Sequence, residues 1–243
     1  MEIEPERRNF IVYDFSIGVV LDCFPMDTRD ALKQAAALGL DGIQVYAIEG
    51  PISPEMTPAA RREFRDLVSS HGLTISALCG DLGHGFFDPA RNPGNIERSK
   101  RILDLAKDLG VDIVTTHIGV VPADPAHPRY AIMQDACGQL AEYADQLGSH
   151  FAVETGPEPA VVLRDFLDSL HSTGVAVNMD PANLAMAFRD SAADNVRVLQ
   201  KYIVHTHAKD GVQIKPCDPE IAYGIRQPCF IKRGFGYYNR FAL

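Results

Sequence analysis

The sequence lacks an excess of basic residues. Its 243 residues include 23 Lys and Arg against 32 Asp and Glu, which gives a formal net charge of −9. Binding to nucleic-acid phosphates needs clustered Lys and Arg, so this composition argues against a nucleic-acid partner. The charge does not exclude a small anionic substrate held in a local pocket.

Long apolar runs and closely spaced cysteines are also missing. No run approaches the roughly 18 apolar residues of a membrane helix. The charged N-terminus, MEIEPERRNF, lacks the apolar core of a secretory signal. The five cysteines are widely spaced and include no CxxC pair, which favours reduced thiols over a disulfide framework or a zinc cluster. We therefore expect a cytoplasmic protein with no membrane partner.

What the sequence does contain is a repeating unit, in which a glycine turn is followed by a short run rich in Val, Ile and Ala. Stretches with apolar residues at helical spacing lie between these runs, and they end at or beside glycine, as left-handed helix caps do. Examples are RDALKQAAALG and NIERSKRILDLAKDLG. The pattern predicts helices between parallel strands near residues 15–21, 42–47, 74–79, 112–117, 150–154, 175–180 and 203–207.

Alternation of helices with continuously apolar strands predicts a parallel sheet covered by helices. No GxGxxG follows the first strand, so the sequence lacks the mark of a dinucleotide-binding open sheet. The expected fold class is α/β, a (β/α)8 TIM barrel that residues 1–243 form as a single domain. A flavodoxin-like open sheet with additional units is the alternative.

Polar or titratable residues follow every predicted strand, at the end where a barrel of this kind carries its chemistry. They are Asp22, Glu49, Asp81 with His84, His117, Glu154, Asp180 and His207.

Three of them, Glu154, Asp180 and His207, each close an uninterrupted apolar strand. Carboxylates in that position are costly unless they are paired or bind a cation. This donor set suits Mn²⁺ or Mg²⁺ and also accepts Co²⁺ or Zn²⁺, whereas the alternative is a carboxylate–histidine ion pair without a metal. By strand alternation, Asn178 and His205 lie one layer deeper and support the ligands from behind.

The segments ISALCGDLGHGF, AVETGPEP, NMDPANLAM and HTHAKDG resemble the xylose isomerase-like TIM-barrel superfamily, with similarity over residues 15–224. The resemblance implies one divalent ion held by Glu154, Asp180 and His207, and by a Glu on the eighth strand. Lys209 and Asp210 match the family's H-x-K-D signature beside the substrate. Asn183 stands where ketose epimerases usually carry His.

The resemblance implies an isomerase or epimerase that acts on a sugar or sugar phosphate by proton transfer through an enediolate. The sequence does not define the oligomeric state, and a homodimer is compatible with it. The implied catalytic residues are Glu154, His117 and Lys209, and the implied substrate-binding residues are His84, Asn183 and Asp210.

Two other activities are compatible with parts of this pattern. An inosose-dehydratase-like lyase would use the same metal and the same proton removal. An apurinic-endonuclease-like activity is disfavoured, because it needs more His ligands and a basic face.

The end of the sequence departs from the family pattern. Residues 225–243 contain no Asp or Glu, and PCFIKRGF, the one plausible strand there, is interrupted by Pro and Gly. We therefore expect the eighth β/α unit to be missing or degenerate, with a gap between the first and seventh strands. Such a chain is expected to be poorly stable, to bind metal weakly and to show little isomerase activity, or to be a truncated non-catalytic barrel with a vestigial metal site.

Overall fold

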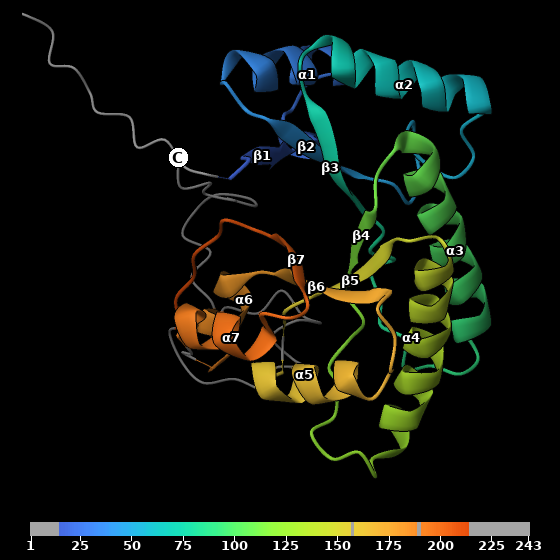
Figure 1. The fold of residues 1–243 in the computed structure, drawn as a ribbon, viewed down its shortest axis with the longest axis vertical. Coiled ribbons are helices and arrows are strands. Elements are labelled where there is room, and N and C mark those ends of the chain that lie inside the picture. Colours follow the sequence, from blue (N-terminus) through green and yellow to red (C-terminus); the bar gives the residue numbers. More distant parts are fainter. Residues whose placement is uncertain (1–14, 157, 189–190, 214–243) are drawn as a thin grey trace, which may run out of the picture.

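A computed structural model describes residues 15–156, 158–188 and 191–213 (Figure 1). Strands and helices alternate along the chain, as the repeating unit predicts. The elements are β1 (Gly18–Val20), the 3-10 helix η1 (Leu21–Cys23), α1 (Thr28–Ala37), β2 (Gly42–Tyr46), α2 (Pro58–Ser70), β3 (Thr74–Cys79), α3 (Asn92–Leu109), β4 (Ile113–Thr116), α4 (Pro128–Gln146), β5 (His150–Glu154), α5 (Ala160–Asp168), β6 (Val175–Met179), α6 (Pro181–Phe188), α7 (Ala192–Leu199) and β7 (Ile203–Thr206).

The strands form one parallel sheet whose spatial order is the chain order, β1 to β7. A flavodoxin-like sheet reverses its strand order at a switch point, so this order confirms the TIM-barrel class and excludes the alternative. Within the described residues β1 and β7 do not pair, and a cavity of about 250 Å³ is lined by both strands. The barrel is therefore open between them. The segment PCFIKRGF and the expected eighth unit lie outside the described residues.

Each strand after β1 agrees with its predicted range to within one residue at either end. The first strand is shorter than predicted, because its expected start and end form other contacts. The backbone N–H of Ile17 donates to the carboxylate of Asp41 at 2.8 Å, and the 3-10 helix begins at Leu21.

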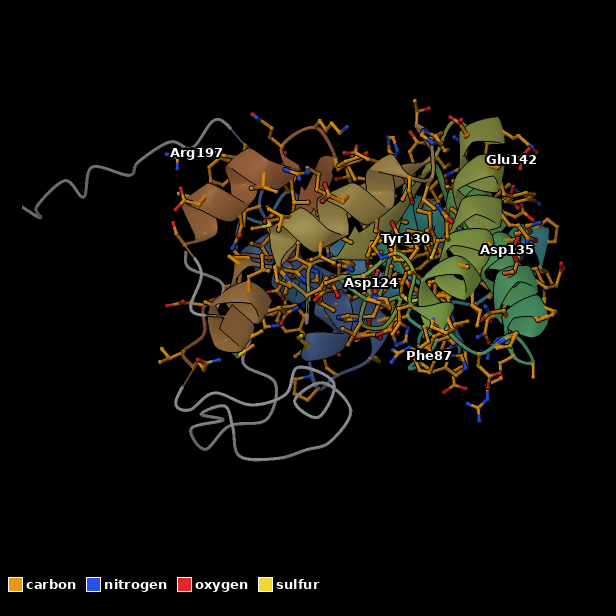
Figure 2. The ribbon with its side chains drawn as sticks, turned by 90° about the horizontal axis from the view of Figure 1, so that it is seen from below. Phe87, Asp124, Tyr130, Asp135, Glu142 and Arg197 are labelled. Atoms are coloured by element: carbon orange, nitrogen blue, oxygen red, sulfur yellow. The ribbon has the colours of Figure 1, made fainter. Side chains whose placement is uncertain are left out.

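Helices cover the outer side of the sheet, and the apolar core lies between the two layers (Figure 1). Helix α4 illustrates the pattern: Met133 and Leu140 are fully buried, whereas Asp135 and Glu142 point outward (Figure 2). No helix in the described part of the chain has the length and hydrophobicity needed to span a membrane.

The predicted glycine caps hold for the helices that end before Gly39, Gly72, Gly110 and Gly148, all of which have positive φ. Helix α5 differs, because the left-handed residue after it is His171, with φ of 50°. Gly174 serves another purpose: a Cβ there would lie 2.0 Å from the carbonyl oxygen of Ala141 and 2.4 Å from the nitrogen of Asp145. Glycine at 174 therefore allows the chain entering β6 to pack directly against α4.

We expect Gly174→Ala to destabilise the protein by several kcal/mol, because backbone on both sides of the contact must move. The matched control is Gly138→Ala in α4, the helix against which Gly174 packs, because a Cβ at position 138 has open space. That change should stabilise the protein by about 1 kcal/mol through helix propensity. Urea unfolding of both variants measures the difference, and equal effects would contradict the packing explanation.

Candidate metal centre

The three predicted metal ligands lie together at the carboxyl ends of adjacent strands. Glu154 ends β5, while Asp180 and His207 follow β6 and β7, and each offers one ligand atom within 4.8 Å of the other two. The Nδ1 atom of His207 is 3.6 Å from Oε2 of Glu154 and 3.6 Å from Oδ2 of Asp180. Donors bound to one ion at roughly 2.0–2.3 Å lie about 3–4 Å from one another, so the trio fits a single divalent cation.

Asp180 is fully buried, and its position follows from the local sequence Asp-Pro-Ala-Asn. Its Oδ1 atom accepts hydrogen bonds from the backbone N–H groups of Ala182 (3.0 Å) and Asn183 (3.2 Å), so Asp180 caps α6 with proline at the first helical position. The hydroxyl of Thr155 accepts from the backbone N–H of Asp180 at 2.7 Å and donates to its carbonyl at 2.9 Å. Only Oδ2 of the carboxylate remains for the centre.

Glu154 accepts hydrogen bonds on both carboxylate oxygens. Asn183 donates to Oε1 at 3.0 Å, and Asn178 donates to Oε2 at 3.2 Å. Burial acts to raise the pKa of Glu154, but the imidazoles of His117 and His207 outweigh it and hold the pKa well below its ordinary value. Glu154 is therefore an anion at neutral pH.

His207 is oriented by a residue that the sequence analysis missed. Its Nε2 atom lies 3.0 Å from Oε1 of Gln44 in β2, and Gln44 in turn donates to the hydroxyl of Thr115 at 2.8 Å. This bond leaves Nδ1 facing the two carboxylates. Burial acts to lower the pKa of His207, but its contacts with Asp180 and Glu154 raise the pKa to about 9. The signal available in the sequence was a glutamine inside the run GIQVY, whose neighbours Ile43 and Val45 are apolar.

Asn178 and His205 contact the ligands from deeper in the barrel, as strand alternation predicts. Asn178 is fully buried and bonds both Glu154 and, through Oδ1, the Nδ1 atom of His205 at 2.9 Å. Burial and the nearby charge of His207 lower the pKa of His205 to about 4. His205 therefore supports the centre as a neutral ring.

The imidazole of His117 lies between two carboxylates, those of Asp81 and Glu154, at the carboxyl ends of the strands. Its Nδ1 atom is 2.8 Å from Oδ2 of Asp81, and its Nε2 atom is 3.4 Å from Oε1 of Glu154. Burial acts to lower the pKa of His117, but Glu154 and Asp81 outweigh it and raise the pKa to about 10. A protonated imidazole thus stands next to the anionic Glu154.

The other predicted site residues divide into two groups. Asn183 and Lys209 belong to the cluster: the ammonium of Lys209 donates to Asp180 at 2.7 Å and to Asn183 at 3.1 Å. The imidazole of His84 contains a buried Nδ1 with no hydrogen-bond partner among the described residues. Asp210 is exposed, and its carboxylate accepts a hydrogen bond from the backbone N–H of Gly211 at 2.7 Å.

Glu158 is a second residue that the sequence analysis missed. It is 3% exposed and accepts a hydrogen bond from the backbone N–H of Val121 at 3.2 Å, which joins the loops after β5 and β4. Burial raises the pKa of Glu158 to about 8. Its place four residues after Glu154, in a loop beyond the strand end, was the only signal.

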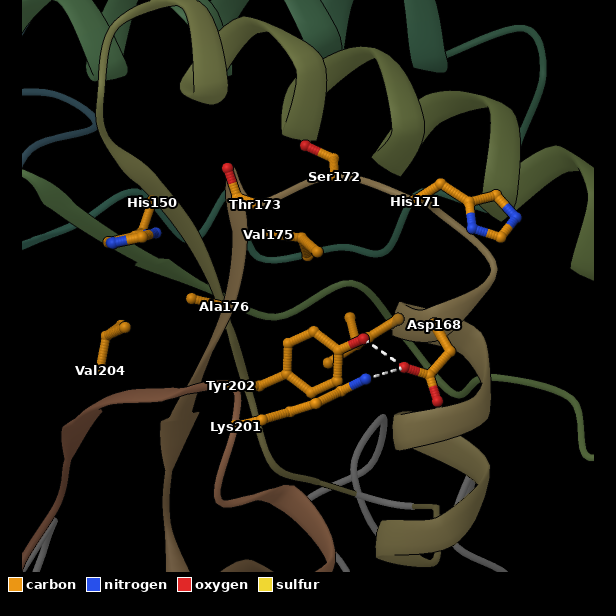
Figure 3. A pocket seen from close by; sticks show the side chains of 11 residues that line it. His150, Asp168, His171, Ser172, Thr173, Val175, Ala176, Lys201, Tyr202 and Val204 are labelled. Carbon is orange, nitrogen blue, oxygen red and sulfur yellow. Dashed lines mark hydrogen bonds and ion pairs between the residues drawn. The ribbon is translucent and has the colours of Figure 1, made fainter.

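A larger cavity of about 620 Å³ lies at the opposite end of the sheet, beside the starts of β5, β6 and β7 (Figure 3). Asp168 lines this cavity, and its carboxylate accepts hydrogen bonds from Lys201 and from the hydroxyl of Tyr202, at 2.5 Å each. In the described part of the chain, the Glu154, Asp180 and His207 trio is the group able to hold a metal ion. The candidate metal centre therefore lies at the carboxyl ends of the strands, away from this cavity.

Parallel strands in chain order, with carboxylates and imidazoles gathered at their carboxyl ends, define a TIM-barrel-like α/β protein. Residues 32–221 match the family described as Xylose isomerase-like TIM barrel, and the chain belongs to that family. The comparison with curated proteins finds no match.

Solved structures share this fold at low sequence identity. A xylose isomerase domain protein from Planctomyces limnophilus is 23% identical, with a TM-score of 0.71 over 81% of this chain and 74% of that one. D-psicose 3-epimerase from Clostridium cellulolyticum H10, solved with D-tagatose, is 16% identical, with a TM-score of 0.69 over 86% and 80%. A xylose isomerase-like TIM-barrel protein from Mycobacterium smegmatis, solved with magnesium, is 18% identical, with a TM-score of 0.64 over 81% and 75%.

The sequence predicts weak metal binding for a chain without an eighth unit, but the convergence of three ligands leads us to the opposite expectation. We expect Mn²⁺ to raise the midpoint of thermal unfolding by several degrees, because an ion bound by the folded state alone stabilises it. Asp180→Asn should abolish this shift while keeping an oxygen that caps α6. Asp66→Asn, at an exposed position on α2, serves as the control and should leave the shift intact. A full shift in the Asp180→Asn variant would contradict this site.

Glu158 should make the free energy of unfolding fall as the pH rises. Because its folded pKa of about 8 lies above the ordinary 4.5, the folded protein keeps a proton that the unfolded chain has released across that range. This group should lower the free energy of unfolding by up to about 1.4 kcal/mol per pH unit between those values.

Glu158→Gln should remove this slope, whereas Glu142→Gln on the outer side of α4 should keep it. Urea unfolding between about pH 5 and pH 8 measures the slopes. Equal slopes in the wild type and Glu158→Gln would contradict the assignment.

Proposed function

We propose that this chain is a divalent-metal-dependent isomerase or epimerase that acts on a sugar or sugar phosphate. The observation that carries the proposal is the convergence of Glu154, Asp180 and His207 at the mouth of a xylose isomerase-like barrel. Two carboxylates and one imidazole suit Mn²⁺ or Mg²⁺, and Co²⁺ or Zn²⁺ also fit. Bound there, such an ion supplies Lewis-acid stabilisation for the negative charge that develops when a proton leaves the carbon next to a carbonyl.

Glu154 is the proposed base in this reaction. It is anionic, and hydrogen bonds from Asn183 and Asn178 fix its carboxylate. The protonated His117 next to it favours the anion, and we assign to His117 the binding of an oxygen of the substrate. Removal of the proton next to the carbonyl by Glu154 yields an enediolate. Return of this proton from Glu154 to the neighbouring carbon on the same face gives isomerisation, whereas epimerisation requires a second proton donor on the opposite face.

The remaining predicted residues receive different roles in this proposal. The unsatisfied Nδ1 of His84 suits a substrate hydroxyl, because buried polar atoms in native proteins are nearly always hydrogen-bonded. Asn183 already bonds Glu154, Thr155 and Lys209, so we assign it to positioning Glu154 rather than to the substrate contact expected from the sequence. Asp210 remains a sequence-based candidate for substrate binding.

The test is proton exchange. Proton exchange needs a base on one face of the substrate alone, so we expect it even from a chain whose net isomerase activity is expected to be low. With Mn²⁺ in D₂O, the chain should exchange the hydrogen next to the carbonyl of a ketose or ketose phosphate, detected by proton NMR across a panel of both. Glu154→Gln should slow the exchange at least about hundredfold, the usual effect of losing a general base. Glu142→Gln, at an exposed position on α4, is the charge-matched control and should exchange at the wild-type rate.

The outcomes of this test distinguish the reaction classes and can overturn the proposed function. Exchange with a rearranged sugar as product supports the proposal. Loss of water to give an unsaturated ketone would identify a lyase of the inosose-dehydratase type instead. Exchange that survives Glu154→Gln, or no exchange with any member of the panel, would contradict the proposed function.

A further inference from the structure

Lys209 makes the closest contact to the metal-facing oxygen of Asp180. Its ammonium nitrogen is 2.7 Å from Oδ2, whereas Nδ1 of His207 lies 3.6 Å from the same atom. The other oxygen, Oδ1, is bound by two backbone N–H groups at the start of α6. The oxygen that the candidate centre needs is therefore held by a cationic side chain.

This pairing has a clear physical cause. Asp180 is fully buried, and a buried carboxylate without a partner strongly destabilises a protein. Lys209 supplies the missing positive charge and is itself fixed by the amide oxygen of Asn183 at 3.1 Å. Its side chain remains 26% exposed at the mouth, so the ammonium reaches solvent by rotating away from Asp180.

We propose that Lys209 is an internal counter-ion for Asp180, and that binding of a divalent ion and pairing of Lys209 with Asp180 exclude each other. The inference rests on the metal site of the proposed function. An ion on Oδ2 at about 2.1 Å would lie within about 5 Å of an ammonium bonded to the same oxygen, and charges of equal sign repel strongly in a buried site. The ion therefore replaces Lys209, whose ammonium turns toward the open mouth.

The variant that tests the proposal is Lys209→Met, which keeps the length of the side chain and removes its charge. Without a metal, this variant should unfold at a lower temperature than the wild type, because Asp180 loses its partner. It should bind Mn²⁺ at least about tenfold more tightly, because no cation competes for Oδ2. Isothermal titration calorimetry with Mn²⁺ measures the affinity, and thermal unfolding with and without Mn²⁺ measures the stability.

Two variants serve as controls. Lys209→Arg retains the charge and should bind Mn²⁺ within a fewfold of the wild-type affinity. Lys201→Met removes the lysine of another Lys–Asp pair, with Asp168 at the opposite end of the strands, and should leave the affinity unchanged (Figure 3).

Lysine labelling of the wild-type protein tests the same proposal without a substitution. Brief acetylation followed by mass spectrometry should show that Mn²⁺ increases the labelling of Lys209 several-fold, while the labelling of Lys201 stays constant. A rate for Lys209 that stays the same or falls on adding Mn²⁺ would overturn the proposal.

The outcomes separate this inference from the proposed function. Mn²⁺ binding that is unchanged or weaker in Lys209→Met, but lost in Asp180→Asn, would overturn the counter-ion role and leave the metal site in place. Failure of both the wild type and Lys209→Met to bind Mn²⁺ would overturn the metal site and the counter-ion proposal together.

Discussion

The buried carboxylate of Asp180 is the constraint on which the mouth of this barrel depends. Full burial of an unpaired charge costs several kcal/mol, so each of its oxygens must have partners. One oxygen caps the N-terminus of α6, and the other accepts a hydrogen bond from Lys209. The hydroxyl of Thr155 also bonds the backbone of Asp180 to the end of β5. The bonds that fold this end of the sheet are therefore the same bonds that shape its candidate chemistry.

The cluster is close to electrical balance when the imidazoles of His117 and His207 are protonated, the form that their raised pKa values of about 10 and about 9 favour at neutral pH. The carboxylates of Glu154, Asp180 and Asp81 then face three cationic groups, those of His117, His207 and Lys209. Binding of a divalent ion is thus an exchange of positive charge rather than an addition. The imidazoles of His117 and His207 hold the pKa of Glu154 well below its ordinary value, so Glu154 is an anion in this cluster, the state that the proposed base requires.

The sequence predicted what depends on local patterns. Apolar runs marked the strands, although β7, at the open side of the barrel, is only partly buried. Glu154, Asp180 and His207 stood out because each closes such a run. The bond between His207 and Gln44 joins positions 163 residues apart, and it exists because the sheet curves until β7 approaches β2. No local pattern carries that information.

The contact between His207 and Gln44 also has a structural consequence for an open barrel. In the described part of the chain β7 pairs with β6 alone and β1 with β2 alone, so the backbone does not close the circle. Side chains cross the interior instead, from His207 to Gln44 and from there to Thr115 in β4. A ligand that fixes His207 against Glu154 and Asp180 therefore restrains the last strand relative to the first half of the sheet. Metal binding at the proposed site would therefore be coupled to the curvature of the sheet through the imidazole of His207.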